Sequence, residues 1–357
     1  MKPCIVHKSA AVPAGINASL GQTYCRLCVA LVGLLLTQFA SIVQAIEPEI
    51  NVADRQRVVV VVGAGGNAAY AGEFADWAEG WQALAVHRQW DLSVIGAEST
   101  PVEEPQATRS TSREQLQLAI DEHAASEARL WIVMLGHGTA AGNNAKFNLA
   151  GPDVSAEELG IWLDRLSCPV VVVNCSSASA PFLPTLSQPG RIVITATRSG
   201  SELNYSRFGK FLAAALQDLS ADLDHDWEVS LLEAFLTAVA RTEQFYRSDS
   251  RLASEHALLD DNGDGRGTSG EFFRGLRPIQ TAKDGEPVDG KSAARVTLFA
   301  APQAVQLTPA QIVERERIEK HIDELRARKA SMEEVAYYAQ LEAWLLELSA
   351  VYTAAEL

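Results

Sequence analysis

The stretch Leu130-Trp-Ile-Val-Met-Leu-Gly-His-Gly138 decides the fold, together with a second stretch of the same kind, Pro169-Val-Val-Val-Val-Asn-Cys175. Each is a run of apolar residues that ends at a dipeptide of glycine or polar residues, His137-Gly138 in the first and Asn174-Cys175 in the second. Runs of this kind are typical of strands buried inside a parallel sheet. In open α/β sheets, chemistry collects at the carboxyl ends of the strands. We therefore expect His137 and Cys175 to lie side by side on one edge of a sheet.

Strand-like and helix-like segments alternate along most of the chain. Further strands are predicted at residues 58–62, 90–95, 191–196 and 294–299. Helices are predicted at 70–84, 155–166, 206–220 and 228–247, and another is predicted to begin at Thr111. Thr111-Ser-Arg-Glu114 and Ser155-Ala-Glu-Glu158 carry capping-box patterns at helix starts. This alternation predicts the α/β class: a three-layer αβα domain whose mainly parallel sheet has about six strands.

The chain is predicted to contain an N-terminal leader, an α/β domain at residues 46–305 and a C-terminal helical hairpin at residues 306–357. In the hairpin, Pro309 stands at a helix start and an apolar stripe follows it. Ser331-Met-Glu-Glu334 is expected to cap the second helix. The hairpin is either a packing appendage of the domain or a regulatory or oligomerisation device.

The leader, residues 1–45, has the pattern of a signal peptide. Residues 27–43 are apolar and follow a basic segment without acids, and Val43 and Ala45 provide the small side chains that a signal peptidase requires. We expect export to the periplasm, the cell envelope or the medium. The alternative is an uncleaved anchor that attaches the protein to a membrane through residues 27–43, a span near the lower length limit for crossing a bilayer.

Composition excludes some functions and limits the chemistry of the thiols. The net charge is −15 and the pI is about 5.0, and no basic run occurs, so nucleic acid is not expected as a partner. Outside the leader only Cys168 and Cys175 remain, at opposite ends of one predicted strand. A strand of that length separates them by roughly 23 Å, far beyond the reach of a disulfide. Both are expected to be free thiols.

The two motifs, an apolar run followed by His137-Gly138 and an apolar run followed by Asn174-Cys175, resemble the signature of the caspase–legumain clan of cysteine peptidases. The small residues after Cys175 leave room for a substrate backbone, and a cysteine at the mouth of a helix has its thiolate favoured by the helix dipole. The segment Ala196-Thr-Arg-Ser-Gly200 is most similar to the legumain-type branch, and the resemblance covers residues 55–300. It implies a caspase-like fold and a cysteine-type endopeptidase that acts on a protein or peptide substrate without a catalytic cofactor.

By this resemblance Cys175 is the nucleophile and His137 is the general base and acid. The backbone N–H groups of Gly138 and Cys175 would form the oxyanion hole. A thioester acyl-enzyme would then be resolved by water or by another amine. Asn67 matches the asparagine that orients the histidine in legumain-type enzymes, and ordinary turn chemistry is its alternative role.

Substrate preference is less defined. Ser199 and Glu202, after the fifth strand, are the candidate substrate-binding residues, and Glu202 would face a basic side chain. Legumains carry an acid where this chain has Val173, and the matching arginine after the first strand is missing. The caspase pattern Gln-Ala-Cys is also absent. Cleavage after asparagine or aspartate is therefore not implied.

Residues 260–271 fit the calcium-loop template of EF-hand proteins. The predicted ligands are Asp260, Asn262, Asp264, Arg266 through its backbone carbonyl, Thr268 and Glu271. A short entering helix is expected at residues 254–259, and glycines weaken the exiting helix, so a lone loop is expected instead of a paired hand. A structural Ca²⁺ is the prediction, and an unligated Asp/Gly turn is the alternative.

Two other functions compete with the peptidase. Val62-Gly-Ala-Gly-Gly-Asn-Ala68 fits a dinucleotide-binding fingerprint, but the acid expected at the end of the second strand is missing. The same scaffold could instead belong to a catalytically inactive, calcium-stabilised envelope protein.

Overall fold

The computed structural model describes residues 56–96, 110–142, 144–281 and 288–355, which all belong to one compact unit spanning Asn51–Leu357. The predicted leader, with its apolar segment 27–43, lies outside the described residues. Within the described ranges, no helix combines the length and the apolar character needed to cross a bilayer.

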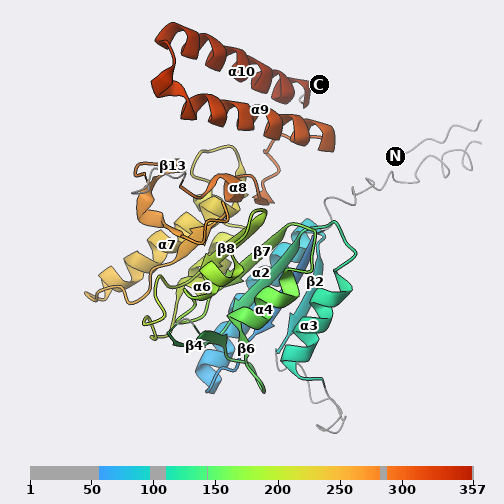
Figure 1. Ribbon diagram of the computed structural model, residues 1–357, viewed down its shortest axis with the longest axis vertical. Coiled ribbons are helices and arrows are strands. Elements are labelled where there is room, and N and C mark those ends of the chain that lie inside the picture. The colour runs from blue at the N-terminus through green and yellow to red at the C-terminus, as the bar shows by residue number, and fades with distance from the viewer. Residues whose placement is uncertain (1–55, 97–109, 143, 282–287, 356–357) are drawn as a thin grey trace, which may run out of the picture. The chain divides into compact units, whose positions relative to one another are not determined.

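A seven-stranded sheet forms the centre of the unit, in the order β11-β10-β8-β7-β3-β1-β2 (Figure 1). Its parallel strands are β1 (Arg57–Val62), β2 (Asp91–Ile95), β3 (Leu130–Leu135), β7 (Val170–Asn174) and β8 (Arg191–Thr195). Two short antiparallel strands, β10 (Leu258–Asp260) and β11 (Thr268–Ser269), extend one edge. The predicted α/β class with a mainly parallel sheet is confirmed.

Helices cover both faces of this sheet and create two apolar cores. Val58, Val60 and Val62 of β1 face one core, and Val59 and Val61 face the other. The first core is covered by α2 (Ala68–Arg88), α6 (Phe208–Ala215) and α7 (Leu231–Ser248), and the second by α3 (Ser112–Glu122), α4 (Ala156–Leu163) and α5 (Phe182–Leu186). Each fully buried valine contributes about 1.5–3 kcal/mol of hydrophobic stabilisation. The continuous apolar runs in the sequence reflect burial on both faces.

Strand register brings the carboxyl ends of β3 and β7 level with each other. Leu130 pairs with Val170, and Met134 pairs with Asn174. The residues that follow these strands therefore emerge together at one edge. The capping boxes predicted at Thr111 and Ser155 are both present, at the starts of α3 and α4.

Two predictions about short elements, one strand and one helix, were wrong. The strand expected at residues 294–299 does not join the central sheet, because β14 (Thr297–Ala300) pairs with β9 (Glu228–Ser230) in a separate sheet. The helix expected at residues 254–259 is absent, because β10 pairs there with β8.

The remaining elements are β4 (Gly138–Ala141), β5 (Asn144–Phe147), β6 (Val154–Ser155), β12 (Phe273–Arg274), β13 (Arg277–Pro278), α8 (Lys291–Ala294) and the 3₁₀ turns Leu219–Ala221, Gly270–Phe272 and Lys329–Ser331.

The C-terminal tail forms a helical hairpin of α9 (Pro309–Ala327) and α10 (Glu334–Ala355). Three residues of the predicted stripe are buried: Ile318, Ile322 and Leu325. Ser331 does not cap α10, because its hydroxyl donates to the Arg328 carbonyl, and Glu333 accepts the Ala336 N–H instead. Ion pairs link α9 to the α/β domain: Arg295 to Asp323 at 3.3 Å and Arg315 to Glu228 at 3.7 Å.

Candidate active site

His137 and Cys175 follow neighbouring parallel strands and lie on the same face of the sheet. Leu135 and Val173 belong to the core under α2, α6 and α7, and the alternation of each strand carries this direction on to the residue two places later. Cys175 is part of that core, and the His137 ring contacts Phe74 of α2 at 5.2 Å between ring centroids. The structure therefore places the predicted pair on one edge and one face.

The imidazole of His137 sits half-buried in an aromatic cluster. Its centroid lies 5.1 Å from that of Tyr70 in an edge-to-face arrangement and 5.8 Å from that of Tyr205. Such packing fixes the ring by dispersion and quadrupole contacts. Among the described residues, neither ring nitrogen has a hydrogen-bond partner. The His137–Cys175 hydrogen bond expected of a resting dyad is therefore not formed.

Cys175 is sealed under α6. Its exposed fraction is 0%, and a Cβ added to Gly209 of α6 would lie 2.8 Å from the Cys175 Cβ and 2.8 Å from the Trp77 ring. Burial raises the pKa of the Cys175 thiol well above its usual range, and the charge of Glu255 raises it further. In this conformation the thiol is covered and protonated at neutral pH.

The helix expected to begin at Cys175 begins later. Residues 175–181 form turns, and α5 starts at Phe182. No helix N-terminus therefore points at Cys175, and the predicted stabilisation of its thiolate by a helix dipole is wrong.

Both N–H groups of the predicted oxyanion hole already have partners inside the protein. The Cys175 N–H donates to the Met134 carbonyl at 2.9 Å, and the Gly138 N–H donates to Ser177 Oγ at 3.3 Å. Stabilising an oxyanion requires donors that point at the place where charge develops. These donors would have to exchange their partners for a substrate.

Two serine hydroxyls lie against Gly138: Ser177 Oγ bonds to its N–H and its carbonyl, and Ser176 Oγ lies beside its Cα. A Cβ added to Gly138 would lie 2.7 Å from Ser176 Oγ. Ser176 Oγ donates to Asn174 Oδ1 at 2.6 Å, while Asn174 Nδ2 is buried and has no partner among the described residues. The signal for Ser176 was the alternation of side chains along the strand. Val173 and Cys175 face the core under α6, so Ser176, one residue further, points away from it.

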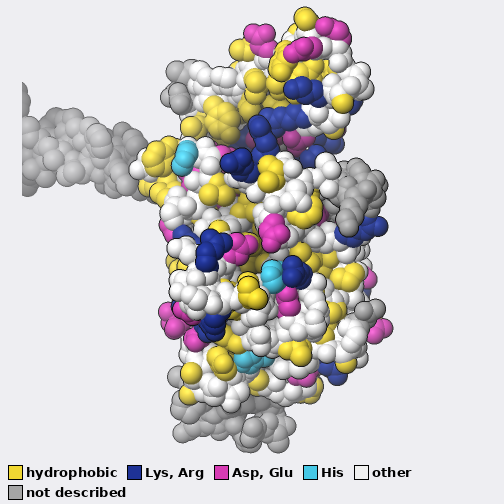
Figure 2. Space-filling model, turned by 90° about the vertical axis from the view of Figure 1, so that its left-hand side faces the viewer, with side chains coloured by type: hydrophobic (Ala, Val, Ile, Leu, Met, Phe, Trp, Pro, Cys, Tyr) yellow, Lys and Arg dark blue, Asp and Glu magenta, His cyan; other side chains and the backbone are white. Residues whose placement is uncertain are grey.

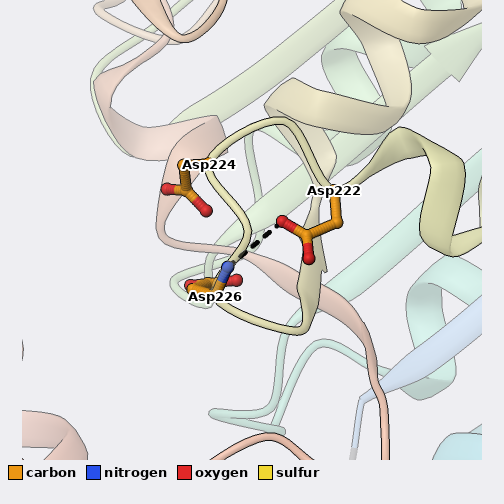
Figure 3. Close-up of side chains that lie close together, drawn as sticks. All are labelled: Asp222, Asp224 and Asp226. Atoms are coloured by element: carbon orange, nitrogen blue, oxygen red, sulfur yellow. Dashed lines mark hydrogen bonds between the residues drawn. The ribbon is translucent and has the colours of Figure 1, made fainter.

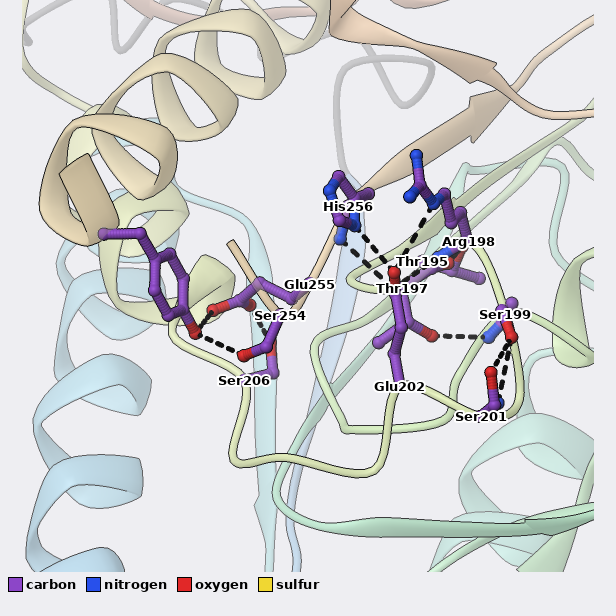
Figure 4. Close-up of polar contacts among 12 residues, drawn as sticks. Thr195, Thr197, Arg198, Ser199, Ser201, Glu202, Ser206, Ser254, Glu255 and His256 are labelled. Atoms are coloured by element: carbon purple, nitrogen blue, oxygen red, sulfur yellow. Dashed lines mark hydrogen bonds and ion pairs between the residues drawn. The ribbon is translucent and has the colours of Figure 1, made fainter. Parts of the chain in front are cut away.

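The other predicted site residues have partners within the protein. Asn67 is exposed and caps α2 by accepting the Tyr70 N–H at 3.0 Å, which is the turn role left open above. Ser199 Oγ lies 2.6 Å from Ser201 Oγ. Glu202 meets the basic groups of this chain itself, since His256 Nδ1 lies 2.6 Å from its carboxylate (Figure 4).

A groove with a volume of about 500 Å³ runs between α2 and α6, beside the helix that seals Cys175. Its lining includes acidic side chains of α2, basic side chains at α6 and an apolar floor: Glu73, Asp76, Trp77, Gly80, Arg207, Lys210, Ala213 and Ala214. Trp77 faces this groove and also packs near Cys175.

The predicted calcium loop joins two strands, not two helices, and thus differs from an EF-hand. The Asp260 carboxylate accepts the N–H groups of Gly263 and Gly265, whose φ angles are 80° and 75°. Asn262 and Asp264 accept in the same way from the Asp264 and Arg266 N–H groups, and Thr268 donates to Asp289 at 2.6 Å. Glu271 lies exposed on the turn after β11. Within the described chain, the loop's acids do not gather into one ligand set.

A second acidic loop, residues 222–227, was not predicted. Ligand atoms of Asp222, Asp224 and Asp226 lie within 4.8 Å of one another (Figure 3). Loss of solvation and the neighbouring carboxylates together raise the pKa of Asp224 to about 6. Asp222 accepts the N–H groups of His225 and Trp227, whose φ angles are 65° and 69°. Asp222, Asp224, Asp226 and Glu233 stand at positions 1, 3, 5 and 12 of the calcium-loop template, with Trp227 where the template has glycine, so the signal was present in the sequence and was missed.

No protein-family model matches the chain, and no curated protein matches it. Among solved structures, the chain is similar to the Drosophila initiator caspase Dronc, with 12% identity over 61% of this chain and 83% of that chain. The TM-score of that superposition is 0.38, a level from which we argue nothing about the site. The α/β architecture rests on the strand order, and the site rests on its own geometry.

Proposed function

We propose that the chain is a cysteine-type hydrolase of peptide bonds whose site is the edge formed by the carboxyl ends of β3 and β7. One observation carries the proposal: His137 and Cys175 follow neighbouring parallel strands and share one face of the sheet. A base and a thiol nucleophile need this proximity. The legumain-type branch, suggested by the sequence resemblance, is part of the same proposal.

The proposed reaction needs the thiol uncovered. His137 would then take the proton of Cys175 Sγ, and the thiolate would attack the peptide carbonyl. The carbon–nitrogen bond breaks as His137 returns the proton to the departing amine, and a thioester remains on Cys175. Water hydrolyses it to a carboxylic acid, or a second amine accepts the acyl group in a transpeptidation.

A polypeptide suits the surface better than a polyanion does. Acidic and basic side chains are interspersed on the face shown in Figure 2, together with apolar ones. The groove between α2 and α6 likewise presents both signs of charge beside an apolar floor. Proteins that bind phosphate backbones concentrate basic side chains instead.

The second candidate is a non-catalytic protein on the same scaffold. The complete burial of Cys175 and the missing His137–Cys175 hydrogen bond favour it. Such a protein would bind a partner without cleaving it.

A peptide-library cleavage profile separates these functions. Because the thiol must first be uncovered, we expect only slow cleavage by the unmodified protein, none by Cys175→Ala, and most of that slow activity in Ser176→Ala, which serves as the matched control at Gly138. Equal cleavage by Cys175→Ala would contradict the thiol mechanism. Loss of cleavage in Ser176→Ala alone would identify the Ser176 hydroxyl, not the Cys175 thiol, as the nucleophile. An absence of cleavage by every form would favour the non-catalytic protein.

We also propose a structural Ca²⁺ at residues 260–271. The left-handed Gly263 and Gly265 and the carboxylate-to-backbone bonds of Asp260 support the sharp turn that the template requires, and binding would have to draw the separated acids together. Calcium should raise the melting temperature of the full chain, and Asp260→Asn should remove that rise. Asp222→Asn is the matched control for the second acidic loop. A melting temperature that calcium does not move would contradict the proposal.

Export through the leader is proposed on sequence grounds alone. The mature chain isolated from its source would then lack residues 1–45. A mass spectrum of the purified protein tests this, and an intact leader in a membrane fraction would favour the anchor.

A further inference from the structure

One continuous segment, residues 198–209, lies over the turn that contains Cys175; we call it the cover. Its first part bonds to the turn, because the Ala178 N–H donates to the Glu202 carbonyl at 2.8 Å. Its last residue, Gly209, lies directly on Cys175. Access to the thiol from this side therefore depends on whether the cover stays closed.

The C-terminal part of the cover is held by a single buried carboxylate. Glu255 is 3% exposed and accepts hydrogen bonds from Ser206 Oγ at 2.5 Å and from the Phe208 N–H at 3.0 Å. It also accepts from the Arg207 N–H at 2.8 Å and from the Tyr246 hydroxyl of α7 at 2.8 Å. One side chain thus ties the beginning of α6 to α7.

The middle of the cover is held by the next residue in the chain. His256 Nδ1 lies 2.6 Å from Glu202 Oε1, and the His256 N–H donates to Glu202 Oε2 at 3.2 Å. The same carboxylate accepts the Arg198 N–H at 3.0 Å, which closes the loop at its start. Figure 4 shows Glu255 and His256 side by side, each contacting a different part of the cover.

We propose that Glu255 and His256 form a clasp that holds the cover closed and keeps the Cys175 thiol latent, so that release of the clasp exposes it. The consequence for catalysis rests on the proposed function, whereas the closure stands on the contacts above. The clasp is polar and sits at the edge of the domain. Phe208 of the cover also packs in the core under α2, α6 and α7, so the opening that exposes Cys175 must lift this side chain as well.

Alkylation of the native full-length chain tests the clasp. Iodoacetamide labelling of Cys175 is followed by mass spectrometry, with Cys168 of the same chain as internal reference. In Glu255→Gln we expect Cys175 to react about 10- to 100-fold faster, the factor that matches loss of one hydrogen bond to a charged group. His256→Ala should have a smaller effect in the same direction. Glu243→Gln, a nearby half-exposed carboxylate of α7, is the matched control and should leave the rate unchanged.

The outcomes separate the clasp from global unfolding and from the proposed function. An unchanged Cys175 rate in both clasp variants overturns the clasp. If Cys168 accelerates in parallel, the variant has unfolded; Tyr246→Phe, which removes only one donor to Glu255, then decides, and an unchanged rate there overturns the clasp. Faster labelling without any peptide cleavage leaves the clasp standing and refutes the peptidase.

Discussion

The two ends of β7 carry the two described thiols of this chain. A simple rule would make the thiol at the carboxyl end the more exposed one, but it is the less exposed. Cys175, at the carboxyl end where α/β enzymes place their chemistry, is 0% exposed, whereas Cys168 at the amino end is 9% exposed. Each packs in a different core. The reason is local: the cover closes the carboxyl end. Position in the sheet identifies a site, but the loops and helices after the strands decide its access.

The largest expected loss of unfolding free energy follows from removing the clasp that seals the carboxyl end of β7. Glu255→Ala leaves four donors without their carboxylate, and each donor that stays buried and unsatisfied costs about 1–3 kcal/mol. Urea unfolding measures the change. Glu243→Ala, at a half-exposed position, should stay within about 0.5 kcal/mol. Equal costs for both variants would remove the distinction between a sealed and an open end.

A smaller loss is expected where α6 presses on the thiol. Gly209→Ala puts a methyl group 2.8 Å from the Cys175 Cβ and the Trp77 ring, and such overpacking costs about 1–3 kcal/mol. Gly72→Ala in α2 meets nothing within 4 Å and should gain about 0.5–1 kcal/mol from reduced backbone entropy. Thermal unfolding of the two variants compares them. A neutral Gly209→Ala would show that Cys175 is not sealed.

The third effect is the response to alkaline pH. Burial raises the pKa of the Cys175 thiol above its ordinary 9.0, so the unfolded chain loses this proton before the folded chain does. Stability that is complete below pH 9 should therefore fall at higher pH, by up to about 1.4 kcal/mol per pH unit. Cys175→Ala should flatten this slope.

Cys168→Ala is the matched comparison for that slope. Burial also raises the pKa of Cys168, but backbone hydrogen bonds at Cys168 and Leu130 lower it. Its removal should change the slope less than removal of Cys175 does. Equal slopes in both variants would mean that the two ends of β7 are equally closed. Urea unfolding at pH 8 to 10 provides the measurement.

The smallest effect is expected from the histidine in the closed state. Because the ring nitrogens of His137 have no partner among the described residues, His137→Ala should leave the native alkylation rate of Cys175 unchanged. In the Glu255→Gln background the same substitution should slow labelling, since the base then reaches the thiol. Slower labelling in the otherwise unmodified chain would show that the pair is already coupled.

Long apolar runs were predicted well, and short pairings were not. The strand at Leu130–Leu135 was predicted with its bounds, because six consecutive buried residues leave no other interpretation. The small sheet of β4, β5 and β6 was missed, as was β10. Their residues carry too little apolar periodicity, and pairing with a distant strand overrode the helical preference of residues 254–259.

The sequence by itself determined the α/β class and the placement of His137 and Cys175 at the carboxyl ends of neighbouring strands, because continuous apolar runs are local properties of each strand. The register of β3 and β7 and the shared face of the two residues came from the tertiary structure. Only the tertiary structure decided that Cys175 is covered, that Ser176 lies against Gly138 and that Glu255 holds α6 in place. These facts join residues 34 to 47 positions apart, through contacts that no local pattern encodes. The same apolar run that places Cys175 at a strand end also directs it into the core.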